Sequence, residues 1–173
     1  MTQQKHIFFA ALATLFAFCS GAALAQDTAT IHVEGSITGS TCSLSVSSAT
    51  LTIGTVQQSV FNGLNSASPP SNVGTIATDP SCTASTVSMT FMANADPNDS
   101  TLFAVTGGAS GVGIKLEGLN SGGVWQQAIP NSTISPIVNV IGVQSFRARY
   151  VQSAAAMVNG TADASITVLV TYT

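Results

Sequence analysis

The chain has 173 residues and a formal net charge of −3, which comes from 4 Lys and Arg against 7 Asp and Glu. Only 6% of the residues are charged and 45% are hydrophobic, a balance that excludes a disordered chain, because disorder goes with few apolar residues and many charges. The scarcity of Lys and Arg excludes the basic surface by which proteins bind nucleic acids or anionic lipids, and two histidines leave little material for catalysis or metal binding.

Residues 1–25 have the three parts of a secretory signal peptide. Lys5 lies in a short positive region, residues 7–18 form an apolar run, and Ala23 and Ala25 are the small residues that a signal peptidase recognises. The apolar run is too short to span a membrane, which takes about 20 residues. The sequence therefore predicts export of the chain, with cleavage after Ala25.

The exported chain, residues 26–173, keeps two cysteines, Cys42 and Cys82. Two cysteines in an exported protein predict one disulfide, with a single possible pairing, and an oxidising compartment. In the chain-entropy description, a closed loop of this length stabilises the fold by about 4 kcal/mol. A lipid anchor at Cys19 is an alternative, but the bulky Phe18 precedes that cysteine where a small residue is normally needed.

Short runs of alternating apolar and polar residues recur along the exported chain and predict β-strands. Pairs of Gly, Pro and Asn that favour turns separate these runs, and no apolar stripe of helical period extends over ten residues. Residues 60–72 are the least strand-like stretch, and we predict a loop there with a short helical turn. This spacing predicts an all-β sandwich, with Arg147 and Arg149 together on the polar face of one strand. The predicted strands comprise residues 31–37, 43–46, 51–53, 87–91, 112–116, 146–151 and 166–172.

The two ends of the exported chain carry strands without evident partners. Residues 166–172 alternate cleanly, with neither Lys nor Pro to protect an open strand edge, which proteins normally avoid leaving bare. Residues 26–35 also alternate, ahead of the first cysteine. A strand missing at one end and a spare strand at the other predict exchange between copies, which builds a filament. The alternative, that residues 26–35 pair within their own chain, is equally compatible with the composition.

These features occur together in one family. Over essentially all of residues 26–173, the chain resembles the pilin subunits of bacterial chaperone–usher fimbriae, of the type 1 and P pilus class. The signal peptide, the cysteine pair and both terminal motifs make the resemblance specific. The segments that carry it are residues 30–37 (TIHVEGSI), Cys42 and Cys82, residues 111–116, residues 146–150, and the C-terminal motif of residues 160–164 and 168–173 with its penultimate tyrosine.

The resemblance implies an incomplete immunoglobulin-like β-sandwich that lacks its last strand and is completed by a donor strand from another subunit. Residues 26–35 would be the donor-strand extension and residues 36–173 the pilin domain. A periplasmic chaperone would lend a strand during folding. An outer-membrane usher would then exchange it for the donor strand of the neighbouring subunit, in a head-to-tail polymer. The subunit would travel through the periplasm to the cell surface, as part of an adhesive fimbrium.

The resemblance also assigns residues. Ile31 and Val33 fall at the apolar positions of the donor strand, and Gly35 follows them. Ala29 stands where the family usually has a glycine, and Asp27 where an apolar residue is often found. The acceptor groove would be bordered by the C-terminal strand, whose terminal carboxylate would anchor the chaperone. The residues implied on that strand are Ile166, Val168, Val170, Tyr172 and Thr173.

The few polar candidates for chemistry do not combine into a catalytic or metal site. His32 is the only histidine of the exported chain, so no triad can form around it, and an outward position on the donor strand is its expected role. Asp96 and Asp99 flank a Pro-Asn pair, where we expect a turn rather than a calcium site. We therefore expect no enzymatic activity, metal, cofactor, nucleic acid or small-molecule substrate.

Two functions are compatible with the sequence. The first is a structural subunit of an adhesive fimbria, assembled by donor-strand exchange through the chaperone–usher pathway. The second is a self-contained secreted β-sandwich that binds a carbohydrate or a host surface as a monomer. Trp125, followed by Gln126 and Gln127, could belong to a sugar site, although a lone tryptophan near a sheet end is more often a packing residue.

Overall fold

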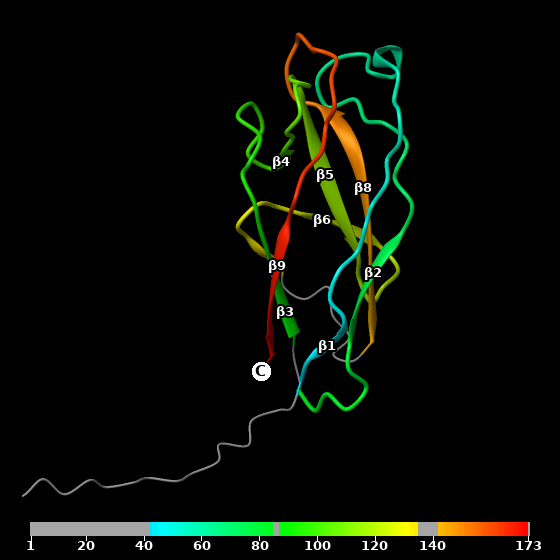
Figure 1. The fold of residues 1–173 in the computed structure, drawn as a ribbon, viewed down its shortest axis with the longest axis vertical. Coiled ribbons are helices and arrows are strands. Elements are labelled where there is room, and N and C mark those ends of the chain that lie inside the picture. The colour runs from blue at the N-terminus through cyan, green and yellow to red at the C-terminus, as the bar shows by residue number, and fades with distance from the viewer. Residues whose placement is uncertain (1–41, 85–86, 135–141, 173) are drawn as a thin grey trace, which may run out of the picture. The chain divides into compact units, whose positions relative to one another are not determined.

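The computed structural model describes residues 42–84, 87–134 and 142–172, which belong to one compact unit, residues 37–173. These residues form strands joined by turns, with one short 3-10 helix, η1 (Gln58–Val60), so the all-β prediction is confirmed (Figure 1). No helix of the described ranges is long and apolar enough to cross a membrane. The predicted signal peptide, the donor segment of residues 26–35 and Thr173 lie outside the described residues.

The strands are arranged in two antiparallel sheets, one of six strands and one of three. In the larger sheet the order is β1 (Leu44–Val46), β2 (Gly74–Thr78), β8 (Val143–Gln152), β5 (Val112–Leu119) and β4 (Phe103–Ala104), and β6 (Trp125–Ala128) also pairs with β5. In the smaller sheet the order is β7 (Thr133–Ile134), β3 (Val87–Met92) and β9 (Thr167–Tyr172). The strand β9 is therefore at an edge, with β3 as its only partner among the described strands.

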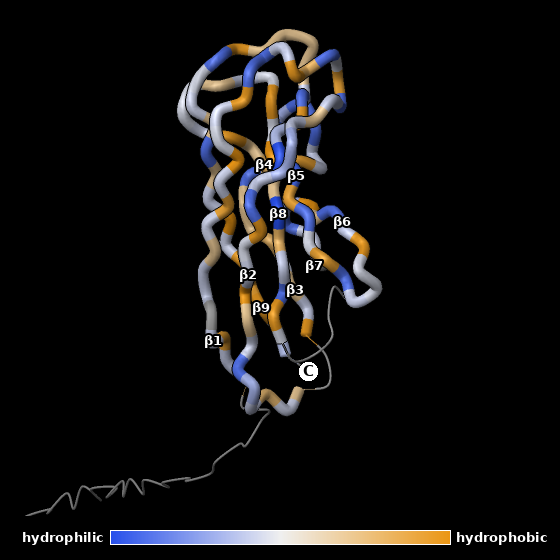
Figure 2. Tube along the Cα trace, turned by 90° about the vertical axis from the view of Figure 1, so that its right-hand side faces the viewer, coloured by the Kyte–Doolittle hydropathy of each residue, from blue (hydrophilic) through white to orange (hydrophobic). Residues whose placement is uncertain are grey.

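Alternation along each strand decides which side chains enter the core. In β8 the residues Gln144, Phe146 and Ala148 are buried, whereas Arg147 and Arg149 lie on the opposite face and are partly exposed. Figure 2 shows the same alternation of hydrophobic and hydrophilic positions along the strands. This pattern follows from the pleat, which turns successive side chains to opposite faces. The predicted polar face with both arginines is confirmed.

The core lies between the two sheets and is built around aromatic side chains. Phe91, Phe103 and Met89 are the largest fully buried side chains. The ring of Phe91 meets that of Phe146 edge to face, with 5.6 Å between centroids, which joins the small sheet to the large one. Apolar residues of β9 and of residues 51–53 also pack against this core but are only partly buried.

The predicted disulfide between Cys42 and Cys82 is present, with an S–S distance of 2.04 Å and 4.4 Å between the Cα atoms. Cys82 is almost fully buried. The bond ties the chain just before β1 to the turn that follows β2. Two strands that pair along one sheet edge are thus also joined covalently.

A serine-rich loop covers part of the edge of β8. The backbone N–H groups of Ser68 and Ser71 donate to the carbonyls of Tyr150 and Ala148, at 2.9 and 2.7 Å. In return, the N–H groups of Tyr150 and Ala148 donate to the hydroxyl oxygens of Ser68 and Ser71, at 3.0 and 2.9 Å. The two hydroxyls accept the hydrogen bonds that carbonyl groups of a neighbouring strand would accept. The predicted loop of residues 60–72 is confirmed.

Several strand predictions need correction. Residues 51–53, predicted as a strand, are not part of either sheet, because no backbone within residues 42–84, 87–134 and 142–172 forms a ladder with them. The last strand begins at Thr167 rather than Ile166, and the helical turn η1 lies at residues 58–60. Four strands, β2, β4, β6 and β7, were not predicted. They are short, and β2 and β6 contain Gly, Thr and Gln in place of a clear apolar alternation.

Candidate functional site, an open apolar groove

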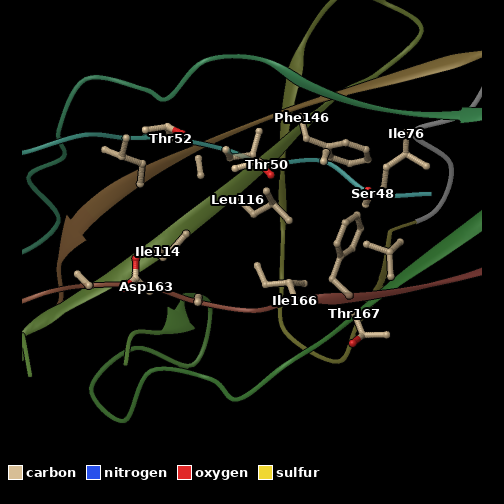
Figure 3. A pocket seen from close by; sticks show the side chains of 18 of the residues that line it. Ser48, Thr50, Thr52, Ile76, Ile114, Leu116, Phe146, Asp163, Ile166 and Thr167 are labelled. Atoms are coloured by element: carbon tan, nitrogen blue, oxygen red, sulfur yellow. The ribbon is translucent and has the colours of Figure 1, made fainter. Parts of the chain in front are cut away.

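A groove of about 800 Å³ opens onto the core between residues 47–54 and residues 162–168 (Figure 3). In Figure 1 these two walls are the cyan segment after β1 and the segment that leads into β9. The floor consists of core side chains from the larger sheet and from β3. The floor residues are Ile76, Phe91, Ile114, Leu116, Phe146 and Ala148.

The two walls face each other without pairing. No backbone hydrogen bond within the described ranges joins residues 47–54 to residues 162–168. On the far side of one wall, the N–H of Thr52 donates to Oδ1 of Asn72 at 2.6 Å, and Nδ2 of Asn72 donates to the carbonyl of Thr50. On the far side of the other wall, β9 pairs with β3. Each wall is therefore held from outside the groove. The two facing edges resemble two strands of a sheet from which the strand between them is missing.

The chemistry of the groove is apolar and nearly uncharged. Leu51 and Ile53 come from one wall, and Ile166 and Val168 from the other, and all four are partly buried against the core. Asp163 carries the single carboxyl group among the described lining residues, and no Lys, Arg or His is among them. A charged side chain that entered this space would lose its hydration without gaining a cationic partner, which is unfavourable.

Tyr150 marks one end of the groove. Its hydroxyl donates a hydrogen bond to the carbonyl of Ala162 at 2.8 Å, so it holds β8 against the start of the second wall. Burial, with a further contribution from the negative charge of Asp163, raises the pKa of Tyr150 above its ordinary value. The phenol is therefore protonated at neutral pH and remains a donor. Beyond Tyr150, a second cavity of about 700 Å³ shares Gly54 and Asp163 with the groove.

The C-terminal residues assigned from the sequence fall into two groups. Ile166 and Val168 line the groove. Val170 and Tyr172 have the same orientation on β9 and pack against the core, but they are not among the lining residues. The Tyr172 hydroxyl is buried without a hydrogen-bond partner in the part of the chain that the structure describes, and burial raises its pKa. Ala29, Ile31, Val33, Gly35 and Thr173 lie outside the described residues.

Sequence reasoning missed the first wall of the groove. Within this wall, residues 51–53 were predicted to be an ordinary strand because Leu51 and Ile53 flank the polar Thr52. The same alternation is present in the structure, where these two side chains contact the core, but no described strand pairs with the segment. Alternation reports which face is buried, and it carries no information on whether an edge is paired.

The other polar candidates have structural roles. The carboxylate of Asp96 accepts hydrogen bonds from the N–H groups of Asn98 and Asp99, at 2.9 and 3.1 Å, and Asp99 accepts from the N–H of Thr101 at 2.9 Å. The expected turn is thus confirmed. Across the described ranges, no three His, Cys, Asp or Glu residues group as metal ligands.

The fold and the groove define a β-sandwich that is open along one side of its core, and comparison with known proteins places it among pilus subunits. The chain belongs to the fimbrial protein family, whose profile matches residues 31–173. It is 30% identical to the type 1 fimbrial subunit of Salmonella typhimurium, over 90% of this chain and 92% of that protein. It is 29% identical to the uncharacterized fimbrial-like protein SfmA of Escherichia coli, over 97% of this chain and 98% of that protein.

Solved structures share the fold. The P pilus rod subunit PapA superposes with a TM-score of 0.58 and 20% identity, covering 83% of this chain and all of that one. A chain from a chaperone–usher pilus structure concerned with rod uncoiling superposes with a TM-score of 0.62 and 18% identity, covering 86% and 97%. The predicted immunoglobulin-like fold is confirmed. The protein is a structural, non-enzymatic subunit of a surface fimbrium, it polymerises with other pilus subunits, and its fimbria implies a part in adhesion.

Proposed function

We propose that the groove accepts a β-strand from another copy of the chain, and that residues 26–35 are that strand. The observation that carries this proposal is the pair of walls that do not pair with each other, on either side of an apolar floor that belongs to the core. A strand laid between them can pair with both walls at once. The contact is head to tail and does not close on itself, so repetition gives a filament.

The chemistry of residues 26–35 suits the groove. Ile31 and Val33 alternate with polar residues, so both can point to the floor from one face of a strand, with Ala29 and Gly35 at the flanking positions of the same face. Complete burial of an Ile or Val side chain contributes about 1.5–3 kcal/mol. The walls are seven and eight residues long, which a ten-residue segment can span.

The same groove motivates the proposed partners before assembly. An open strand edge beside an apolar floor would pair with any available strand and aggregate. We therefore include a periplasmic chaperone that fills the groove with its own strand and is anchored by the carboxylate of Thr173, and an outer-membrane usher at which the exchange takes place. Residues 1–25 would be the signal peptide that directs the chain into the periplasm, and residues 36–173 the pilin domain.

The proposal is tested by adding a charge to each face of the donor strand in turn. Ile31→Asp and Val33→Asp should abolish polymerisation, because an aspartate cannot be desolvated against Ile166 and Leu116 without a partner. His32→Asp adds the same charge on the opposite face and should polymerise normally. The measurement is the ladder of detergent-resistant oligomers on a gel of unheated samples, for chains exported together with a matching chaperone and usher.

Two further outcomes decide between the candidate functions. Deletion of residues 26–35 should remove the ladder while the chaperone-bound subunit is still recovered. A single monomer band from both the full chain and the deletion, with the deletion still folded, would instead support a self-contained module. Normal ladders from Ile31→Asp would overturn the donor-strand assignment.

A further inference from the structure

All the lysines and arginines of the chain except Lys5 gather at one place. Lys115 and Arg147 lie around the buried carboxylate of Glu117, at 3.7 Å and 2.8 Å, and Arg149 contacts the same carboxylate at 3.0 Å. Three cations around one anion leave two positive charges in excess. The chain as a whole is acidic, so this cluster is the one place in the described ranges with a surplus of positive charge.

The cluster lies on the outer face of the larger sheet, away from the groove. Glu117 is opposite Arg147 and Lys115 is opposite Arg149 in the β5–β8 ladder. The neighbouring positions Leu116 and Ala148 point the other way and line the groove floor. Any ligand at the cluster therefore leaves the groove free, and the site goes beyond the assembly function proposed above.

Trp125 and Gln127 border the cluster on the same face. The guanidinium carbon of Arg147 lies 4.2 Å from the centroid of the Trp125 ring, a cation–π contact. Gln127 is opposite Glu117 in the β5–β6 ladder, and its amide N–H donates to the carbonyl of Thr101, so its amide oxygen is still able to accept. By alternation Gln126 points to the other face, so of the two glutamines only Gln127 belongs to this site.

Glu117 orders the guanidinium groups without neutralising them. Arg147 donates to it through Nε and Arg149 through Nη2, each arginine using one N–H group. Both arginine side chains are 22% exposed, so N–H groups that Glu117 does not use, other than the buried Nε of Arg149, can bind a second acid. The arginines are thus fixed in advance, which reduces the entropy lost on binding, and their planar donors match the two oxygens of a carboxylate.

We propose that this cluster, Lys115, Arg147, Arg149, Trp125 and Gln127, is a binding site for a carboxylate-bearing sugar, such as a sialic or uronic acid residue of a glycan. The excess positive charge attracts the carboxylate. The partly exposed indole offers an apolar surface for the ring carbons of the sugar, and the amide oxygen of Gln127 an acceptor for a hydroxyl.

Charge complementarity favours a ligand with a single carboxylate over a polyanion. Electrostatic screening at physiological salt acts over about 8 Å, so a single carboxylate experiences mainly the local surplus. A long polyanion would also extend over the rest of an acidic protein. One such site binds weakly, but a fimbria repeats it at every subunit, and repetition raises the overall avidity.

The test measures sugar binding to the exported full chain by saturation-transfer NMR, with 3′-sialyllactose as probe and lactose as the neutral control. We expect sialyllactose to bind at least tenfold more tightly than lactose. Arg149→Gln should weaken sialyllactose binding at least fivefold, and Arg149→Lys, which keeps the charge but not the planar donors, should recover only part of it. Val124→Ala, at an exposed neighbour outside the site, should bind as the unaltered chain does.

A second variant covers the case in which Arg149→Gln fails to fold. Lys115→Gln removes one charge with the longest of the three contacts to Glu117, and it should weaken binding at least twofold while the melting temperature changes little. Equal binding of the two sugars, or unchanged binding in both variants, overturns the proposal. The proposal would also be overturned if the unaltered chain bound neither sugar and the two variants lost a salt-dependent association between copies. That result would identify the cluster as a contact between subunits.

Discussion

The buried carboxylate of Glu117 stays ionised because three cationic side chains surround it. Burial by itself raises the pKa of the Glu117 carboxyl, but the hydrogen bond from Arg147 and the positive charges of Arg149, Arg147 and Lys115 outweigh it, so the pKa lies below the ordinary value of 4.5. The carboxylate is ionised throughout the neutral range. Because the ionised form is favoured in the folded state, the interaction stabilises the fold above pH 4.5. This contribution to the free energy of unfolding is lost as the pH falls through the folded-state pKa.

We predict that acid weakens the fold partly through this residue. In the unaltered chain the free energy of unfolding should fall as the pH drops below 4.5. Glu117→Gln should unfold more easily at neutral pH, by about 1–3 kcal/mol, and should lose less stability on acidification. The measurement is urea unfolding between pH 3 and pH 7, roughly the window in which carboxyl groups titrate. Parallel acid slopes for the two proteins would contradict the assignment.

Two positions, Gly108 and Gly111, require glycine for different reasons: one for its backbone conformation alone, the other also for close packing. Gly111 and Gly108 both have positive φ, at 72° and 103°. A Cβ at Gly111 would lie 2.1 Å from the carbonyl oxygen of Ala156, whereas a Cβ at Gly108 would meet nothing within 4 Å. Both positions favour glycine for its backbone, but only at Gly111 would an added Cβ also clash with another segment.

Substitution of each glycine by alanine should therefore give unequal losses. Gly108→Ala should lose about 1–2 kcal/mol from the left-handed backbone conformation alone. Gly111→Ala should lose a further 1–3 kcal/mol, roughly, because the backbone of Ala156 has to move. Chemical unfolding of the two variants measures the difference in the free energy of unfolding. Equal losses would mean that the loop around residue 156 moves away from the new Cβ at little energetic cost.

At the scale of elements, the loop of residues 62–72 covers a strand edge with hydrogen bonds, whereas the segment of residues 47–54 presents an edge that is not paired across the groove. The loop covers β8 with alternating backbone and serine hydroxyl bonds. Its Asn72 then holds the first groove wall from outside. The edge of β8 is thus paired inside the subunit, whereas within the described ranges the backbone of residues 47–54 has no backbone hydrogen bond across the groove to residues 162–168. The proposed donor strand would occupy the space between them.

The hydroxyls of Ser68 and Ser71 are expected to stabilise the subunit in a way that exposed serines do not. Ser71→Ala leaves the N–H of Ala148 without an acceptor, and Ser68→Ala does the same to Tyr150. Each variant should lose about 1–3 kcal/mol in the free energy of unfolding. Ser100→Ala, at an exposed turn, serves as the control and should change little. A loss no larger than that of the control would show that water replaces these hydroxyls.

At the scale of the whole domain, the groove leaves part of the core without a covering strand among the described residues. Leu51, Ile53, Ile166 and Val168 are partly buried against Phe91 and Phe146, so a strand that covers them would remove apolar surface from water. The domain should accordingly be more stable when the groove is filled than when it is open.

A peptide with the sequence of residues 26–35 should raise the melting temperature of a chain that lacks these residues. At a concentration 100 times the dissociation constant, linkage adds about 2.7 kcal/mol to the free energy of unfolding. The peptide with Ile31→Asp should have no effect, and the peptide with His32→Asp should act like the original. Stabilisation by all three peptides alike would point to a non-specific contact. Differential scanning fluorimetry is the measurement.

Much of this protein follows from local chemistry and is therefore readable in the sequence. Alternation identified the strands with one apolar face, such as Val87–Met92 and Val143–Gln152. The cysteine count in an exported chain was enough for the disulfide. The single histidine of residues 26–173, the sparse charge and the bare C-terminal strand favoured assembly over enzymatic chemistry, and the family resemblance predicted the form of that assembly.

Tertiary structure decided what depends on contacts between distant segments. Residues 47–54 form a wall rather than a sheet strand because no described strand pairs with them, and the local pattern does not encode such pairing. That Lys115, Arg147 and Arg149 converge on Glu117 depends on the register between β5 and β8, set by the packing of Leu116 and Ala148 on the other face. A pattern of residues determines which face is buried. Only the fold determines which edges meet, because pairing is a relation between segments far apart in the chain.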